Sequence, residues 1–152
     1  MLEGFRSIPR APLWLGLAGA IPFAAGVIAY AAGGIWIFDQ DLAVRSTVAY
    51  GAVILSFLAG VRWGLGLLIE NPDSRDARLA LSTIPSLLGW VALLLPAFPA
   101  LVLLAVAFAA QGAWDAGDAV EDGAPEWYGH QRTMLTGLVC SLLSVMAVLA
   151  IL

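Results

Sequence analysis

The 152-residue sequence contains no lysine, one histidine and one cysteine. Without lysine there is no Gly-Lys-Ser/Thr phosphate loop, and a single histidine with a single cysteine cannot supply the ligand set of a zinc, haem or iron–sulfur centre. A lone cysteine, Cys140, also excludes a disulfide within the chain. The seven basic residues are all arginine, they are scattered, and the net charge is −4. A nucleic-acid surface needs a dense basic patch, which scattered arginines do not form, so we predict no nucleic-acid partner. From the single histidine and single cysteine we predict no metal and no cofactor.

Charge of either sign is scarce. Only 12% of the residues are charged, against about 25% in soluble proteins, whereas 61% are hydrophobic. The surroundings of most of this chain are therefore lipid, and we predict an integral membrane protein whose first partner is the bilayer.

Five apolar runs are long enough to cross a membrane. A bilayer core about 30 Å thick needs roughly 20 apolar residues per helix. Charged residues, prolines and glycines divide the chain into candidate helices at about 13–33, 47–69, 79–95, 100–114 and 134–152. Pro22 should kink the first helix, the second must end before Pro72, and the segment 96–99 should form a tight hairpin. The predicted fold is all-α: one domain, 1–152, forming a bundle of five transmembrane helices.

The distribution of arginine predicts the orientation. With five crossings, one side of the membrane receives Arg6, Arg10, Arg75, Arg78 and Arg132, and the other receives only Arg45. Because loops on the cytoplasmic side are enriched in basic residues, we expect the N-terminus inside. A cleaved signal peptide is the alternative, since 29–31 reads Ala-Tyr-Ala. An apolar run of about 20 residues is longer than the usual 7–15 of such a peptide, so we expect a retained helix.

Arg62 interrupts the apolar run of the second helix. An arginine within the bilayer costs several kcal/mol unless it is paired or reaches water. Its side chain leans toward the N-terminus of its helix, away from the nearer interface, so reaching water there is the less favourable option. Apart from Glu70, roughly 12 Å away along the same helix, Asp115 is the one carboxylate close to an apolar run on the correct side. We predict an ion pair between Arg62 and Asp115.

Other polar residues should lie at the same face of the bundle. Gln111 precedes Asp115 by four residues and so projects from the same side of its helix, while Ser82 and Ser86 begin the neighbouring one. We expect them to add hydrogen bonds to the pair. Two interpretations stay open: the cluster only holds helices together, or it belongs to a site for a lipid head group, a quinone or an anion near Arg62.

Small residues recur every four positions on the second helix, at Ala52, Ser56, Gly60 and Gly64. Such a ridge lets a neighbouring backbone approach closely, and it indicates helix packing rather than a ligand groove. Arg62 projects about 200° round the helix from Gly60, so this helix should have neighbours on two sides. No nucleophile stands beside the single histidine, His130, so we expect no enzyme.

Several motifs resemble a known family. They are Ser-Phe-x-x-Gly-x-Arg-Trp-Gly at 56–64, Ser-Thr-Ile-Pro-Ser at 82–86 with Gly89-Trp90, Trp127-Tyr128, and Arg-Thr-Met-Leu-Thr at 132–136. The chain resembles the transmembrane protein 69 family, small multi-helix membrane proteins of bacteria and of animal mitochondria. The resemblance implies a multi-pass protein of the bacterial inner (cytoplasmic) membrane and of unknown function, with no catalytic residues to transfer.

These observations predict a structural, accessory or assembly component that contacts other membrane proteins. The alternative is a protein that handles a small molecule or ion, with a lipid head group, quinone or anion bound near Arg62.

Overall fold

The computed structural model describes residues 8–37, 39–118 and 123–152. The regular elements of these residues are helices, in the order α2 (Arg10–Ala31), α3 (Gln40–Gly66), α4 (Pro72–Ser82), α5 (Ile84–Leu94), α6 (Ala97–Asp118) and α7 (Glu126–Leu149). With α4 and α5 counted as one span, five spans are long and apolar enough to cross a membrane. The predicted all-α bundle of five transmembrane helices is confirmed.

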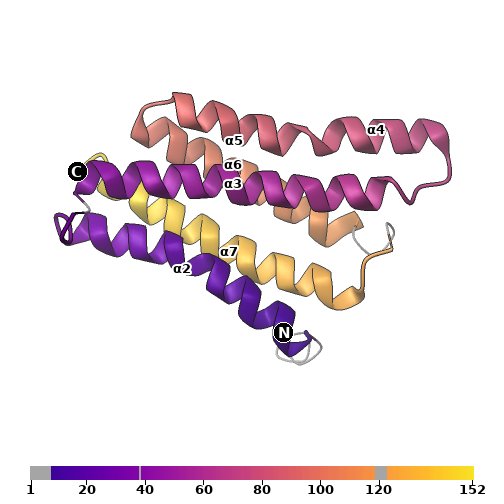
Figure 1. Ribbon diagram of the computed structural model, residues 1–152, viewed down its shortest axis with the longest axis horizontal. Coiled ribbons are helices and arrows are strands. Elements are labelled where there is room, and N and C mark those ends of the chain that lie inside the picture. Colours follow the sequence, from indigo (N-terminus) through magenta and orange to yellow (C-terminus); the bar gives the residue numbers. More distant parts are fainter. Residues whose placement is uncertain (1–7, 38, 119–122) are drawn as a thin grey trace.

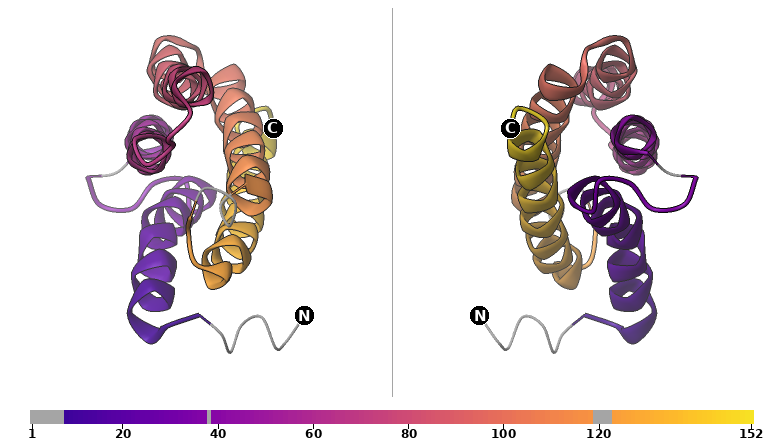
Figure 2. Two further views of the ribbon diagram at one scale, coloured as in Figure 1. Left: turned by 90° about the vertical axis from the view of Figure 1, so that its right-hand side faces the viewer. Right: turned by 90° about the vertical axis from the view of Figure 1, so that its left-hand side faces the viewer.

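Successive spans run antiparallel (Figure 1). One end of the bundle, here called the N side, holds the starts of α2, α4 and α7 and the ends of α3 and α6. The opposite end, the C side, holds the starts of α3 and α6 and the ends of α2, α5 and α7. Viewed along the helices, α2 and α3 face α6 and α7, with α4 and α5 above them (Figure 2). The helices contact one another in a ring, α2–α3–α5–α6–α7–α2, and α3 also contacts α6.

The core lies where these helices meet. The largest buried apolar side chains come from α2, α3, α6 and α7: Phe23, Leu55, Leu101, Leu104, Phe108, Leu143 and Met146. Phe23 joins α2 to α3 and to α6, because its ring packs edge-on against Tyr50 at 5.1 Å and against Phe108 at 5.8 Å between centroids. Many large apolar residues elsewhere are exposed, as expected of a surface that faces acyl chains.

Helix α2 changes neighbours along its length. Toward the C side it packs on α3, where Gly26 leaves room for the Thr47 side chain. Toward the N side it packs on α7, where a Cβ on Gly16 would lie 2.6 Å from a Leu135 methyl carbon. The Gln131 amide donates there to the carbonyl of Pro12. α2 therefore diverges from α3 toward the N side, which Figure 1 shows as a widening angle between the two ribbons.

All five spans begin earlier than predicted, three of them by seven or eight residues, and local capping explains two of these three. Asp39 caps α3, because its carboxylate accepts from the Leu42 N–H at 2.7 Å. Asn71 caps α4, accepting from the Ser74 N–H at 3.1 Å, with Pro72 in the first turn. These caps make the polar first turns of α3 and α4 helical, although such turns add little to an apolar run. α7 likewise starts directly after Pro125, before the predicted position 134.

The ends of the helices also differ from the predicted ones. α2 ends at Ala31 in a Schellman motif: Gly33, with φ +74°, donates to the Tyr30 carbonyl, and Gly34 donates to the Ala29 carbonyl. α6 continues to Asp118, beyond the predicted 114. The hairpin between α5 and α6 is as tight as predicted, with two residues, Leu95 and Pro96, between the helices.

The third span is broken. α4 ends at Ser82 and α5 begins at Ile84, with Thr83 between them. Pro85 has no N–H to donate to the preceding turn, and its ring displaces the backbone there. The hydroxyls of Ser82 and Thr83 turn back and donate to the carbonyls of Leu79 and Ala80, at 2.7 and 2.8 Å.

Candidate functional site: a buried arginine–aspartate–arginine cluster

Asp115 of α6 is fully buried and accepts hydrogen bonds from two arginines. Its Oδ1 lies 2.8 Å from Nε of Arg62 on α3, and its Oδ2 lies 2.8 Å from Nε of Arg132 on α7. Both arginine residues are buried, at 3% and 8% exposure. The predicted pair of Arg62 with Asp115 therefore forms, and Arg132 completes it as a three-residue cluster that ties α3, α6 and α7 together.

Gln111 and Trp114 surround the cluster. The Gln111 amide donates to Asp115 Oδ1 at 3.0 Å, as the four-residue spacing predicts. The carbonyl of Trp114 accepts from Arg62 Nη2, and the Trp114 ring stacks on the guanidinium at 4.5 Å from its centroid. The other amide atom of Gln111, Oε1, is buried with no partner among the described residues.

The cluster lies near the N side rather than at mid-membrane. Arg62 is four residues from the end of α3 and Arg132 six residues from the start of α7, roughly 6 and 9 Å along the helices. Burying ions at this depth is less costly than at the bilayer centre, and each carboxylate oxygen accepts a charge-assisted bond.

The two predicted serines do not join the cluster. Ser82 is buried, but its hydroxyl donates to the Leu79 carbonyl of its own helix. Ser86 is half-buried and makes no side-chain hydrogen bond within the described part of the chain. Ser82 is the last residue of α4, and the break at Thr83 separates it from Ser86 on α5.

The predicted ridge on α3 divides into two parts. Ala52 packs against α5, where a Cβ on Gly89 would lie 3.1 Å from the Ala52 Cα. Ser56, Gly60 and Gly64 are exposed, and a Cβ on either glycine would meet no atom within 4 Å in the described structure. The expectation of helix packing within the chain is therefore met at Ala52 and not at the other three positions.

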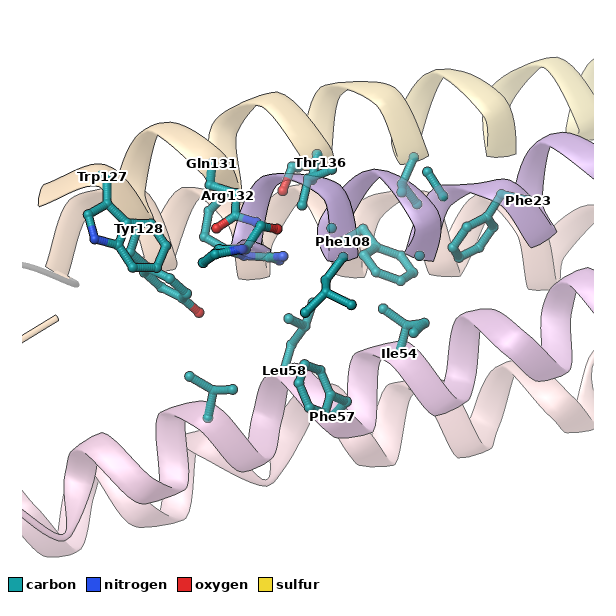
Figure 3. Close-up of a pocket in the computed structure, with 18 residues that line it drawn as sticks. Phe23, Ile54, Phe57, Leu58, Phe108, Trp127, Tyr128, Gln131, Arg132 and Thr136 are labelled. Atoms are coloured by element: carbon teal, nitrogen blue, oxygen red, sulfur yellow. The ribbon is translucent and has the colours of Figure 1, made fainter. Parts of the chain in front are cut away.

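A cavity of about 390 Å³ lies beside the cluster, between α2, α3, α6 and α7 (Figure 3). Most of its wall is apolar: Leu15, Phe23, Ile54, Phe57, Leu58, Val61, Phe108, Leu135 and Val139 are among the lining residues. Its polar lining comes from the first turns of α7, with Trp127, Tyr128, Gln131, Arg132 and Thr136. The hydroxyls of Tyr128 and Thr136 are buried and without a hydrogen-bond partner in the part of the chain that the structure describes.

Sequence reasoning missed the role of Arg132 and the cavity. Arg132 was placed at the correct face but outside the last helix, because that helix was expected to begin at 134. The available signal was the spacing of Tyr128, Arg132 and Thr136, which puts all three on one side of a helix that starts at Glu126.

Comparison with known proteins gives a family and no activity. A family model described as "Protein of unknown function (DUF3429)" matches residues 8–148. Two similar curated proteins are both called "Transmembrane protein 69": that of Xenopus tropicalis is 42% identical over 94 residues, and that of Mus musculus is 37% identical over 87. These matches cover 61% and 57% of this chain but only 36% and 34% of the relatives, so the chain corresponds to about a third of their length. No solved structure matches the chain.

Proposed function

The chain belongs to the DUF3429 family and is similar to proteins called transmembrane protein 69, and from that premise we propose a role for it as an accessory or assembly component that binds another membrane protein. It is a polytopic membrane protein. The observation that carries the proposal is the unoccupied half of the small-residue ridge on α3, formed by Ser56, Gly60 and Gly64 and here called the α3 face.

The α3 face has the chemistry of a helix–helix contact surface. Lipid tails are as apolar as leucine, so transmembrane helices associate through close packing rather than through hydrophobic burial, and small residues permit that packing. The Ser56 hydroxyl donates to the Ala52 carbonyl at 2.9 Å, so it does not project from the α3 face. Phe57 and Trp63, both exposed, flank the glycines and offer large side chains to a partner.

The arginine–aspartate–arginine cluster supports a structural rather than an enzymatic role. Its carboxylate is fully buried and bonded to three side chains of its own bundle. A reacting molecule would have to displace these bonds to reach Asp115. That the chain is no enzyme stays our prediction, and the cluster's task in this proposal is to hold α3 at a fixed angle.

We place the protein in the bacterial inner membrane with its N-terminus inside. Arg10, Arg75, Arg78 and Arg132 lie at or near helix starts on the N side, and Arg45 lies near the start of α3 on the C side. Arg6 falls outside the described residues. Single cysteines at Ser74 and Gln40 in a Cys140→Ser background would test the orientation with a thiol reagent that does not cross membranes. Labelling of the Ser74 position from outside the cell would contradict it.

The accessory role is tested by site-specific crosslinking in native membranes. A photoreactive residue at Ser56 should give a discrete adduct with a different membrane protein. Gly60→Leu with Gly64→Leu should abolish it, because branched side chains hold a partner backbone away. Gly137→Leu is the matched control, since Gly137 is an exposed helical glycine of α7 with nothing within 4 Å of its Cβ position. An adduct unchanged by the leucines, or a crosslink only to lipid or to a second copy, would overturn the proposal.

A further inference from the structure

We propose that the cavity between α2, α3, α6 and α7 binds an anionic lipid, with an acyl chain among its apolar side chains and an anionic head at Tyr128 and Arg132. The cavity borders the α3 face at Phe57, but this proposal does not depend on a partner at that face. The shared chemistry of the ligand is a phosphate or carboxylate joined to a long hydrocarbon chain.

The lining of the cavity changes from polar to apolar along α7. Trp127, Tyr128 and Arg132 lie within the first two turns, at the N side, whereas Val139 lies roughly 10 Å deeper than Arg132. Phe23 and Phe108 close the deep end (Figure 3). A lipid has the same order, with the head group at the membrane surface and the hydrocarbon below it. The volume, about 390 Å³, falls within the range of roughly 300–1,000 Å³ typical of ligand pockets.

Hydrogen-bond donors at the polar end are available to a head group. The Tyr128 hydroxyl is buried with no partner in the described structure, and Figure 3 shows it pointing toward α3 across the cavity. A buried hydroxyl without a partner is costly, and a ligand oxygen would satisfy it. Arg132 uses its Nε for Asp115, and within the described part of the chain its two Nη groups make no hydrogen bond. Such a guanidinium edge matches the oxygens of a phosphate or carboxylate.

The cavity opens sideways, toward the bilayer. Leu15 of α2 and Phe57 of α3 line it, yet they are 74% and 66% exposed, so they form the rim of an opening between the two helices. The opening follows from the divergence of α2 from α3 toward the N side. A membrane lipid enters by this route without crossing water, and basic pockets between transmembrane helices are known lipid head-group sites. A free anion would leave the apolar wall unfilled, and a quinone would bring no charge to Arg132.

Binding of defined ligands to the purified full chain in detergent tests this inference. Native mass spectrometry would compare phosphatidylglycerol, phosphatidylcholine with the same acyl chains, palmitate, inorganic phosphate and a short-chain quinone. We expect phosphatidylglycerol or palmitate to bind at least about tenfold more tightly than phosphatidylcholine, because the choline cation of phosphatidylcholine offsets its phosphate charge and is repelled by Arg132. Tighter binding of phosphatidylglycerol identifies a phosphate head, and tighter binding of palmitate identifies a carboxylate head.

Two variants test whether the ligand binds in the cavity. Tyr128→Phe removes only the unpartnered hydroxyl and should weaken binding of the preferred lipid by about tenfold. Tyr30→Phe, a tyrosine of α2 outside the cavity lining, is the matched control and should bind as the wild type does. Val61→Trp should fill the space and abolish binding, and if it does not fold, Tyr128→Phe decides alone.

Equal binding of phosphatidylcholine, displacement by the quinone, binding of inorganic phosphate as tight as that of the lipid, or a Tyr128→Phe variant that binds as Tyr30→Phe does would each overturn the proposal.

Discussion

Replacing Asp115 with leucine should destabilise the protein by about 3–5 kcal/mol, the usual cost of breaking a buried ion pair from one side. The structure gives the reason. The carboxylate accepts from Arg62 and Arg132 at 2.8 Å and from Gln111 at 3.0 Å, and hydrogen bonds to charged groups are worth about 1.5–3 kcal/mol each. Leucine would lose all three bonds and leave two buried cations without the carboxylate they share.

The three charged residues of the cluster depend on one another, so the combination of substitutions that restores stability tests this description. Arg62→Met with Asp115→Leu removes the pair predicted from sequence, but Arg132 stays buried without its carboxylate, and we expect this double variant to remain about 3 kcal/mol less stable than wild type. Adding Arg132→Met should recover stability to within about 1 kcal/mol, because an apolar replacement of a whole buried charge cluster is often neutral.

Reversible unfolding in mixed micelles, followed by helical circular dichroism, measures these differences. The exposed pair Asp41–Arg45, with side chains 70% and 75% exposed, is the control, and Asp41→Leu with Arg45→Met should leave stability nearly unchanged. The reasoning is refuted if the triple variant is no more stable than the double, or if Asp115→Leu is as harmless as the control. A charge swap of Arg62 and Asp115 is not a suitable test, because the new arginine at 115 would face Arg132.

Three smaller changes test the packing and capping described above, all by the same unfolding assay. Gly112→Ala would place a Cβ against the Thr136 hydroxyl and should cost about 1–3 kcal/mol, whereas Gly64→Ala, with open space around it, should be neutral; equal effects would contradict the close approach of α6 and α7. Phe23→Ala should cost about 3–5 kcal/mol, because this 1% exposed ring joins α2 to α3 and α6, and a cost below 1 kcal/mol would contradict its place in the core. Asp39→Ala should cost about 1 kcal/mol through loss of the α3 cap, and an unchanged midpoint would show that the cap contributes nothing.

The five-span bundle could be predicted from sequence because hydrophobic length is a strong signal in a chain with so few charges. The pairing of Arg62 with Asp115 could also be predicted, since alternating crossings put both at one face and a buried cation needs an anion. The helix starts were less accessible. Asp39 and Asn71 are capping residues that a search for apolar runs ignores, so the predicted starts of α3 and α4 lie seven residues after the observed ones.

The rest of the site depends on three-dimensional placement. Ser82 lies at the helix break and donates to the Leu79 carbonyl of its own helix, and Pro85 alone does not predict that hydrogen bond. Gly60 and Gly64 carry the same pattern as Ala52, yet only Ala52 meets another helix, because a small-residue spacing shows that contact is feasible without showing which helix supplies it. The cavity results from the tilt of α2, a property that no local pattern encodes.

The polar cluster can form only late in synthesis, because its residues lie far apart in the sequence. Arg62 is synthesised 53 residues before Asp115, which in turn precedes Arg132 by 17 residues. During elongation, α3 is therefore available for insertion while its counter-ion does not yet exist. Arg62 lies one turn from the end of α3, so its long side chain can bend against its usual lean and reach the head-group layer until α6 arrives. The last helix then brings Arg132, so the cluster is complete only when most of the chain has been synthesised.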